Sequence, residues 1–220
     1  TQTGQGTQGA ALKAGENTDR VATEEFDGTS WAAGGDYSTS RSYASGAGTQ
    51  IAGLIISGDT SPGTPPTTYT TTCEEYNGST WTGGGAVNTG ANYMVAGETQ
   101  TAAIKATGRP GSITNAETYD GSTWTAAPVC NTATHGSYAT TNGTQTAFLK
   151  MTGTVPGVTA NVEEWNGSVW AEIANVTTAR QGGSGAGTAL SGMVCGGGNP
   201  ATTVTESYVI PDAIKTFTSS

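Results

Sequence analysis

The sequence predicts an all-β fold built from repeated four-stranded units, and three observations carry this prediction. First, the 220 residues include 34 Gly and only 11% charged residues, so residues that favour helices are scarce. Second, a phrase of eight residues recurs along the chain and ends each time in Trp. Third, every copy contains Asn-Gly or Asp-Gly, a pair typical of β-hairpin turns.

Two phrases define the repeat. The first reads EEFDGTSW, EEYNGSTW, ETYDGSTW and EEWNGSVW, and it ends at Trp31, Trp81, Trp124 and Trp170. Successive copies lie about 43 to 50 residues apart. The second phrase, Gly-Thr-Gln or a variant, occurs five times, ahead of each copy of the first. A fifth copy of the first phrase is degenerate, because Glu206-Ser207-Tyr208 lies at the expected spacing but Ala213 occupies the position where Trp is expected.

Each unit offers four short strands. The apolar run after Thr-Gln, as in residues 51–56, predicts a buried strand, and the small residues before it, as in 41–45, predict another. The first phrase supplies two more strands around a type I′ turn, in which both central residues need positive φ. A four-stranded sheet of this period is one propeller blade, and such blades stack because none can bury its own faces.

Five units account for the chain, so we expect one domain, a five-bladed β-propeller. The units run near 1–35, 36–85, 86–128, 129–174 and 175–220. If the sequence is part of a longer protein, the same units would belong to a larger propeller or array. The connection between the second and third strands varies in length and is rich in Gly and Pro, which places the variable loops on one rim.

The order of these elements resembles the kelch repeat, in which an aromatic residue and a Trp are spaced across the last hairpin. More narrowly, GTQTA followed by EEYNGSTW resembles the Thr- and Gly-rich kelch-like repeats of bacteriophage tail fibres and virion appendages, those of cyanophages especially. The resemblance covers about residues 1 to 210, although the kelch diglycine is intact only at Gly196-Gly197. It implies a propeller with a structural or binding role and no shared catalytic site.

Composition argues against several function classes. The net charge of −9 and the pI near 4.4 speak against nucleic acid as a partner, and no apolar run is long enough to span a membrane. A single histidine, His135, is too few for a copper radical oxidase or a three-His zinc site. We therefore expect no metal and no cofactor. Cys73, Cys130 and Cys195 are expected to be free thiols.

The paired glutamates look at first like acid and base catalysts. They recur at one repeat position, at 24–25, 74–75 and 163–164, whereas a catalytic pair is needed only once. We therefore expect structural carboxylates that cap backbone groups or face solvent, and no enzyme activity.

The candidate binding residues fall into three groups. Trp31, Trp81, Trp124 and Trp170 are expected to pack between blades, with sugar stacking as the alternative. Arg41 and Arg180 precede the second phrase in only some units, and His135 lies near the same place in the fourth. These groups could face the channel and bind an anionic sugar or a carboxylate of a partner, or each Arg could pair with a nearby Asp or Glu. The variable rim adds Ser61 and Thr64, within 61–68, and Arg109, within 109–113.

The leading functional expectation is a structural or binding propeller of a phage virion. Its partners would be a host-surface carbohydrate, other virion proteins or copies of itself. The alternative is a secreted bacterial adhesin or lectin-like module at the cell surface. An enzyme that acts on polysaccharide is disfavoured, because no non-repeating pair of carboxylates is found in the sequence.

Overall fold

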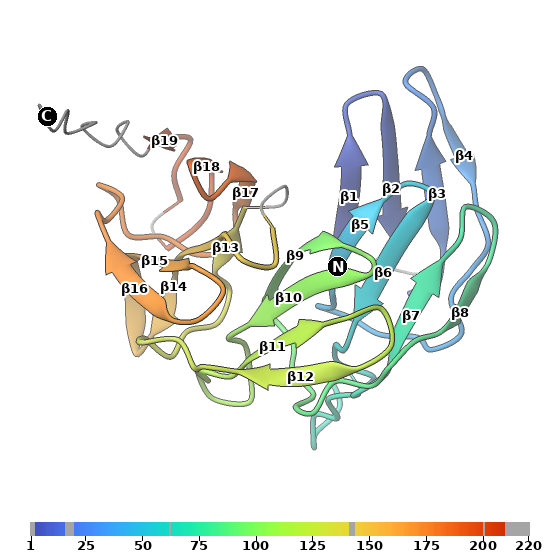
Figure 1. Cartoon of the computed structure of the whole chain (residues 1–220), viewed down its shortest axis with the longest axis horizontal. Coiled ribbons are helices and arrows are strands. Elements are labelled where there is room, and N and C mark those ends of the chain that lie inside the picture. Colours follow the sequence, from blue (N-terminus) through green and yellow to red (C-terminus); the bar gives the residue numbers. More distant parts are fainter. Residues whose placement is uncertain (1–2, 16–19, 62, 141–143, 200, 210–220) are drawn as a thin grey trace, which may run out of the picture.

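The computed structural model describes residues 3–15, 20–61, 63–140, 144–199 and 201–209. Nineteen strands form five antiparallel sheets in these ranges, and each sheet lies inside one predicted unit (Figure 1). The predicted all-β, five-bladed propeller is therefore confirmed. Within the same ranges, the structure has no helix that is long and apolar enough to cross a membrane.

The strands follow the sequence within each sheet. Blade 1 contains β1 (Thr3–Thr7), β2 (Ala10–Ala14), β3 (Thr23–Phe26) and β4 (Trp31–Ala33). Blade 2 contains β5 (Ser45–Thr49), β6 (Ala52–Ile56), β7 (Cys73–Tyr76) and β8 (Trp81–Gly83). Blade 3 contains β9 (Val95–Thr99), β10 (Ala102–Ala106), β11 (Ala116–Tyr119) and β12 (Trp124–Ala127). Blade 4 contains β13 (Tyr138–Ala139), β14 (Phe148–Val155), β15 (Gly157–Trp165) and β16 (Trp170–Ile173). Blade 5 contains β17 (Ser184–Thr188), β18 (Ser191–Cys195) and β19 (Thr205–Val209), and Ala213 lies outside the described residues.

The blades form an arc around a central axis, with blades 1 and 5 at its two ends (Figure 1). The first strands of successive blades contact one another along the axis. Small residues make this approach possible, since a Cβ on Gly46 would lie 2.3 Å from the side-chain oxygen of Gln5 in the preceding blade. The abundance of Gly in the sequence thus reflects how closely the inner strands approach each other.

The first strand of blade 2 starts later than the sequence suggested. A strand was expected over 41–45, but β5 runs from Ser45 to Thr49 and includes the Gly-Thr of the second phrase. The residues before it make only an isolated bridge, between Ser42 and Asp59. Gly48 can occupy the strand because it tolerates its φ of 100°.

The hairpin turns between third and fourth strands also differ from the prediction. Phe26 pairs with Trp31, so the loop has four residues, 27–30, and is not a two-residue type I′ turn. Only Gly28 has positive φ there. The carboxylate of Asp27 accepts the backbone N–H groups of Thr29 and Ser30, both at 2.8 Å, and these bonds lower its pKa. Hydrogen bonds to the Asp27 carboxylate therefore stabilise this loop, which does not need the second residue of positive φ that a type I′ turn requires.

Apolar layers between the blades form the core. The second strands contribute Leu12, Leu54, Ile104 and Leu149, each at most 1% exposed. Of the repeat tryptophans, Trp124 and Trp170 are buried between blades, and Trp81 is partly buried and donates its indole N–H to Thr23 in blade 1 at 2.9 Å. For Trp31 the packing prediction is wrong, because half of its surface is exposed at the free end of the arc.

The three cysteines are free, as predicted. Cys73 and Cys130 are buried, and Cys195 is partly exposed. Burial raises the pKa of the Cys73 thiol to about 11 and that of Cys130 to about 12, so both are protonated and unreactive at neutral pH.

Glu98 departs from the repeat in a way that costs stability. Its equivalents in blades 1, 2 and 5 are Gly6, Gly48 and Gly187, which all have positive φ. Glu98 has a φ of 90° as well, which strains a residue with a Cβ. Its side chain is 7% exposed, and Oε1 finds no hydrogen-bond partner. Burial raises the pKa of Glu98 to about 7.

Replacing Glu98 should therefore stabilise the fold, most strongly at alkaline pH. Because its pKa is raised above the unfolded value of 4.5, the folded state loses stability as the pH rises from about 4.5 through 7. Glu98→Gly should remove both the strain and the buried charge, and it should gain about 1–3 kcal/mol at pH 8. Denaturant unfolding at pH 5 and pH 8 measures both effects. Glu98→Gln is the matched control, because it removes the titration and keeps the strain. A Glu98→Gly protein less stable than wild type at pH 8 would contradict this account.

Candidate binding site at the channel mouth

A collar of backbone hydrogen bonds surrounds one mouth of the channel. Tyr43, Tyr93, Gly136 and Gly182 occupy equivalent places just before the first strands of blades 2 to 5, and all have positive φ. The N–H of each donates to the carbonyl of the one before it, at 3.2, 2.9 and 3.3 Å in chain order. The collar therefore links four blades directly, next to the variable rim that the sequence indicated.

Aromatic and basic side chains gather on this collar. The rings of Tyr43 and Tyr93 stack, with centroids 4.2 Å apart. The guanidinium of Arg109 lies over the Tyr93 ring, 5.5 Å from its centroid, a cation–π geometry. The ring of His135 meets Tyr93 edge-on at 6.4 Å. Two residues that the sequence had placed in different groups, Arg109 and His135, are thus brought together.

The hydrogen bonds fix the protonation state of His135. Arg109 can only donate, so the Nε2 atom of His135, 2.9 Å from its guanidinium, must accept. Ser112 Oγ donates to the carbonyl of Thr154 and lies 2.9 Å from Nδ1 of His135, which therefore carries the proton. Partial burial and the charge of Arg109 both lower the pKa of His135. The site accordingly presents one cation, Arg109, beside a neutral imidazole.

A cavity of about 330 Å³ lies against these groups. Its lining comes from blades 3, 4 and 5 and consists of Tyr93, Arg109, His135, Gly136, Gln181, Gly182, Gly198 and Asn199. None of these residues is acidic, whereas the chain as a whole carries a net charge of −9. The lining offers a guanidinium, two amides and an aromatic ring, which suits a polar or anionic ligand.

The rim residues Ser61 and Thr64 do not reach this cavity. Ser61 closes its own loop, because its hydroxyl donates to the carbonyl of Pro66 and accepts the N–H of Thr68. Thr64 donates its N–H to the carbonyl of Ser61 and is exposed. Ser61 and Thr64 thus bond within their own loop, and neither belongs to the wall of the cavity beside Arg109.

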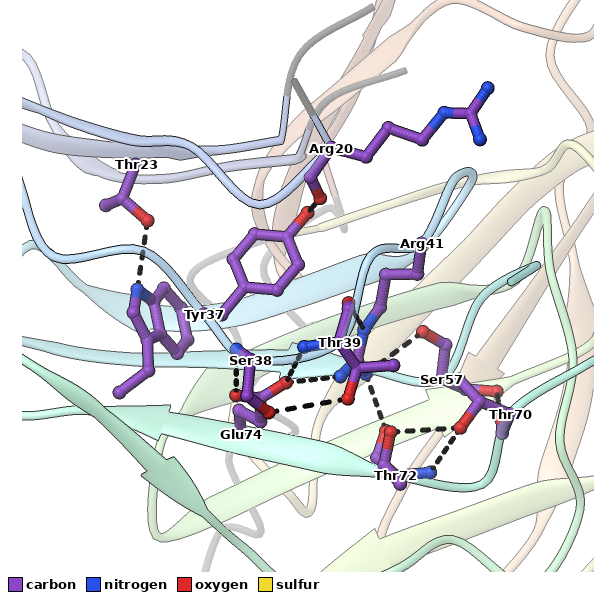
Figure 2. A network of polar contacts seen from close by, with 11 residues as sticks. Arg20, Thr23, Tyr37, Ser38, Thr39, Arg41, Ser57, Thr70, Thr72 and Glu74 are labelled. Carbon is purple, nitrogen blue, oxygen red and sulfur yellow. Dashed lines mark hydrogen bonds and ion pairs between the residues drawn. The ribbon is translucent and has the colours of Figure 1, made fainter. Parts of the chain in front are cut away.

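Arg41 and Arg180 lie in buried ion pairs, so the interpretation that they face the channel is wrong. Arg41 is 1% exposed and contacts the Glu74 carboxylate at 2.5 Å (Figure 2). Its other N–H groups donate to the carbonyls of Thr39, Ser57 and Thr72. Arg180 pairs with Glu206 in the same way. The alternative stated from the sequence, a strand-end arginine paired with a nearby acid, describes both residues.

The carboxylates of these pairs also hold the connection from the preceding blade. Glu74 accepts the backbone N–H groups of Ser38 and Thr39 at 2.7 and 3.2 Å (Figure 2). The same two bonds recur at Glu117, Glu163 and Glu206. The expectation that these glutamates cap backbone groups is confirmed. The second glutamate of the pair serves the next blade, since Glu75 accepts the Tyr119 hydroxyl at 2.5 Å.

A lysine replaces the arginine in the other blades. Lys105 contacts Glu117 at 2.8 Å and Lys150 contacts Glu163 at 2.6 Å, and both lysines are fully buried. They lie in the second strand, directly opposite the glutamate, where blade 2 has Ile55. Each blade therefore has one cation, supplied from one of two positions. Sequence reasoning missed these lysines, although their recurrence after Leu or Ile, at 12–13, 104–105 and 149–150, is a visible signal.

Moving the cation between its two positions tests this account. Arg41→Ala leaves the Glu74 carboxylate buried without a cation and should cost about 3–5 kcal/mol of unfolding free energy. Ile55→Lys in the same chain supplies the lysine that blades 3 and 4 use and should restore most of that loss. Ile55→Lys alone, with two cations for one carboxylate, is the matched control and should destabilise. Denaturant unfolding of the four proteins gives the coupling energy, and simple additivity would contradict the exchange.

Potential metal ligands do not cluster in the described ranges, where no group of three or more His, Cys, Asp or Glu side chains could hold an ion. No family model matches the sequence, and no curated protein matches it. Among solved structures, the chain is similar to "Structure of YjhT", a kelch-repeat protein, with a TM-score of 0.72 and 16% sequence identity. The match covers 89% of this chain and 72% of that one. By fold, then, the chain is a β-propeller of kelch-like blades.

Proposed function

We propose that this protein is a non-enzymatic binding propeller that holds a carboxylated sugar of a surface glycan at its channel mouth. The observation that carries the proposal is Arg109, an exposed guanidinium held in place by the Tyr93 ring and the neutral His135. A guanidinium binds a carboxylate through two parallel hydrogen bonds. Because Arg109 is already oriented, little of its side-chain entropy remains to be lost on binding.

The rest of the lining supports a sugar as the ligand. The amides of Gln181 and Asn199 can exchange hydrogen bonds with hydroxyl groups. The cavity lining contains no Asp or Glu, whereas glycoside hydrolysis in most families uses a pair of carboxylates. Binding without turnover is the activity that this set of groups supports.

The location of the protein on a virion is the second part of the proposal. It rests on the likeness of the repeat phrases to those of phage tail fibres and virion appendages. A secreted adhesin or lectin-like module at the cell surface would use the same site and is the alternative. Genes for tail, baseplate or capsid proteins beside the gene for this chain would favour the virion, and secretion genes there would favour the adhesin.

Loss of the Arg109 guanidinium should abolish most of the binding. A glycan array with uronic acid sugars and their neutral counterparts is probed with wild type, Arg109→Ala and Arg109→Lys. We expect wild type to prefer the acidic sugars and Arg109→Ala to lose about 10- to 100-fold in affinity, as the removal of a charged hydrogen bond predicts. Arg109→Lys keeps the positive charge but loses the two parallel N–H donors of the guanidinium, so its affinity should lie between those of wild type and Arg109→Ala.

The controls separate the site from its surroundings. Arg20→Ala removes the same charge from blade 1, away from the cavity lining, and should bind like wild type. Thr64→Ala tests the variable loop of blade 2 and should also leave binding unchanged. Equal binding by wild type and Arg109→Ala would refute the proposed site, and wild-type binding to none of the glycans would favour a purely structural role.

A further inference from the structure

The two ends of the blade arc expose faces that are buried everywhere else in the molecule. We call the surface of a blade that contacts the next blade its trailing face, and the surface that contacts the previous blade its leading face. The trailing face of blade 5 includes Met193, Thr205, Ser207 and Val209. The leading face of blade 1 includes Gln8, Phe26 and Trp31. The four interfaces between successive blades show which contacts a trailing face and a leading face make when they pack together.

The trailing face of blade 5 exposes positions that the other blades bury. Met193 stands where the second strands of blades 1 to 4 have Leu or Ile, and it is 40% exposed, whereas those residues are at most 1% exposed. Met193 pairs with Ser207 in the neighbouring strand. Ser207 and Val209 are exposed on the same face, since alternate residues of a strand share a side.

The leading face of blade 1 is exposed to a similar degree. Trp31 is 50% exposed, whereas Trp124 is 3% and Trp170 is 6% exposed. Phe26 is partly exposed, and its equivalents Tyr76 and Tyr119 are fully buried. A large aromatic side chain left half in water next to a well-packed blade is typical of a binding surface.

The seam between these two faces is open. A cavity of about 490 Å³ lies among the inner strands, and its wall comes from blades 1, 2, 3 and 5. Trp31 of blade 1 and Ser184 and Gly185 of blade 5 belong to this wall, so the cavity reaches the seam. No hydrogen bond joins blades 1 and 5 among the residues that the structure describes, although every other pair of neighbouring blades shares several. Within the described residues, then, neither face is packed against another blade as the internal faces are.

The two faces are chemically complementary to each other. The indole of Trp81 donates to Thr23, and blade 5 carries a threonine, Thr205, at the place of Thr23. The Trp31 indole can thus find the acceptor that Trp81 finds. Trp31 is equivalent to Trp81 in the repeat, and Thr205 is equivalent to Thr23. The hydrogen bond of the blade 1–blade 2 interface could therefore form in the same way between a blade 5 and a blade 1 that meet.

The carboxylate–phenol pair of the first two internal interfaces is missing from both faces at once. Glu25 accepts the Tyr76 hydroxyl across the first interface. At the free ends, Ser207 stands in place of Glu25, and Phe26 stands in place of Tyr76. Bringing these two faces together therefore buries neither an unpaired carboxylate nor an unpaired phenol.

A third group completes the match. Gln50, Gln100 and Gln145 each donate to the carbonyl of the aromatic residue in the blade before them, at 2.7 Å. Gln8 is the equivalent residue of blade 1 and is exposed. The carbonyl of Tyr208 in blade 5 would be its acceptor in a docked pair.

We propose that the trailing face of blade 5 in one copy docks on the leading face of blade 1 in a second copy. The contact is head-to-tail, so each copy keeps one free end and the assembly can extend. In this structure the seam within one molecule does not bury the two anchor residues, because Trp31 stays 50% and Met193 stays 40% exposed. The proposal is independent of the glycan site.

Two charge substitutions, each on one face, test this contact. Trp31→Glu blocks the leading face and Met193→Glu blocks the trailing face, and both residues are exposed, so the fold should survive. Wild type should grow in mass with concentration in light scattering after size exclusion. Each variant alone should associate at least about 10-fold more weakly, as loss of an anchor residue predicts.

The decisive arm is the mixture of the two variants. A Trp31→Glu copy keeps its trailing face and a Met193→Glu copy keeps its leading face, so a 1:1 mixture should form dimers that do not extend. Thr64→Glu, on the far rim loop, is the matched control and should assemble like wild type. A wild type that stays monomeric over the whole concentration range overturns the proposal, whether the seam closes internally or takes another partner. Variants that assemble like wild type overturn it equally.

Discussion

One carboxylate on the third strand of each of blades 2 to 5, largely removed from solvent, organises the architecture around it. Glu74, Glu117, Glu163 and Glu206 each accept two backbone N–H groups from the connection that enters their blade, and each contacts one cation. A carboxylate buried without such partners would cost several kcal/mol. The fold must therefore keep the backbone N–H groups and the cation beside each carboxylate. Because the N–H groups belong to the connection from the preceding blade, these bonds set the position of each blade relative to the one before it.

This constraint leaves the source of the cation open. Blades 2 and 5 take an arginine from the segment before the first strand, and blades 3 and 4 take a lysine from the second strand. Where the arginine is present, the opposite strand position holds Ile55 or Val194. The repeat conserves the charge balance of each blade without conserving the residue, because a buried ion pair needs one cation at the carboxylate and not a particular backbone position.

The same connections between blades determine the geometry of the channel mouth. The segments that cap the carboxylates lead directly into Tyr43, Tyr93, Gly136 and Gly182, which link the blades as a collar. Backbone hydrogen bonds hold the collar in place, so the side chains on and beside it can differ from blade to blade. Arg109 and His135 each occur in a single blade. A residue that is absent from the other blades is not needed to build a blade, and this favours a role in binding.

The sequence by itself determined the all-β class, the number of blades and the structural role of the glutamates, because these depend on a local pattern repeated with a fixed period. It misplaced the first strand, the hairpin turn and the two arginines, since small residues and side-chain caps leave their local conformation ambiguous. Only the tertiary structure decided that Arg41 is buried on Glu74, that Arg109 meets His135, and that Trp31 stands at an open end. Each of these depends on how whole blades are placed in space, and contacts between residues that distant in sequence leave no local signature.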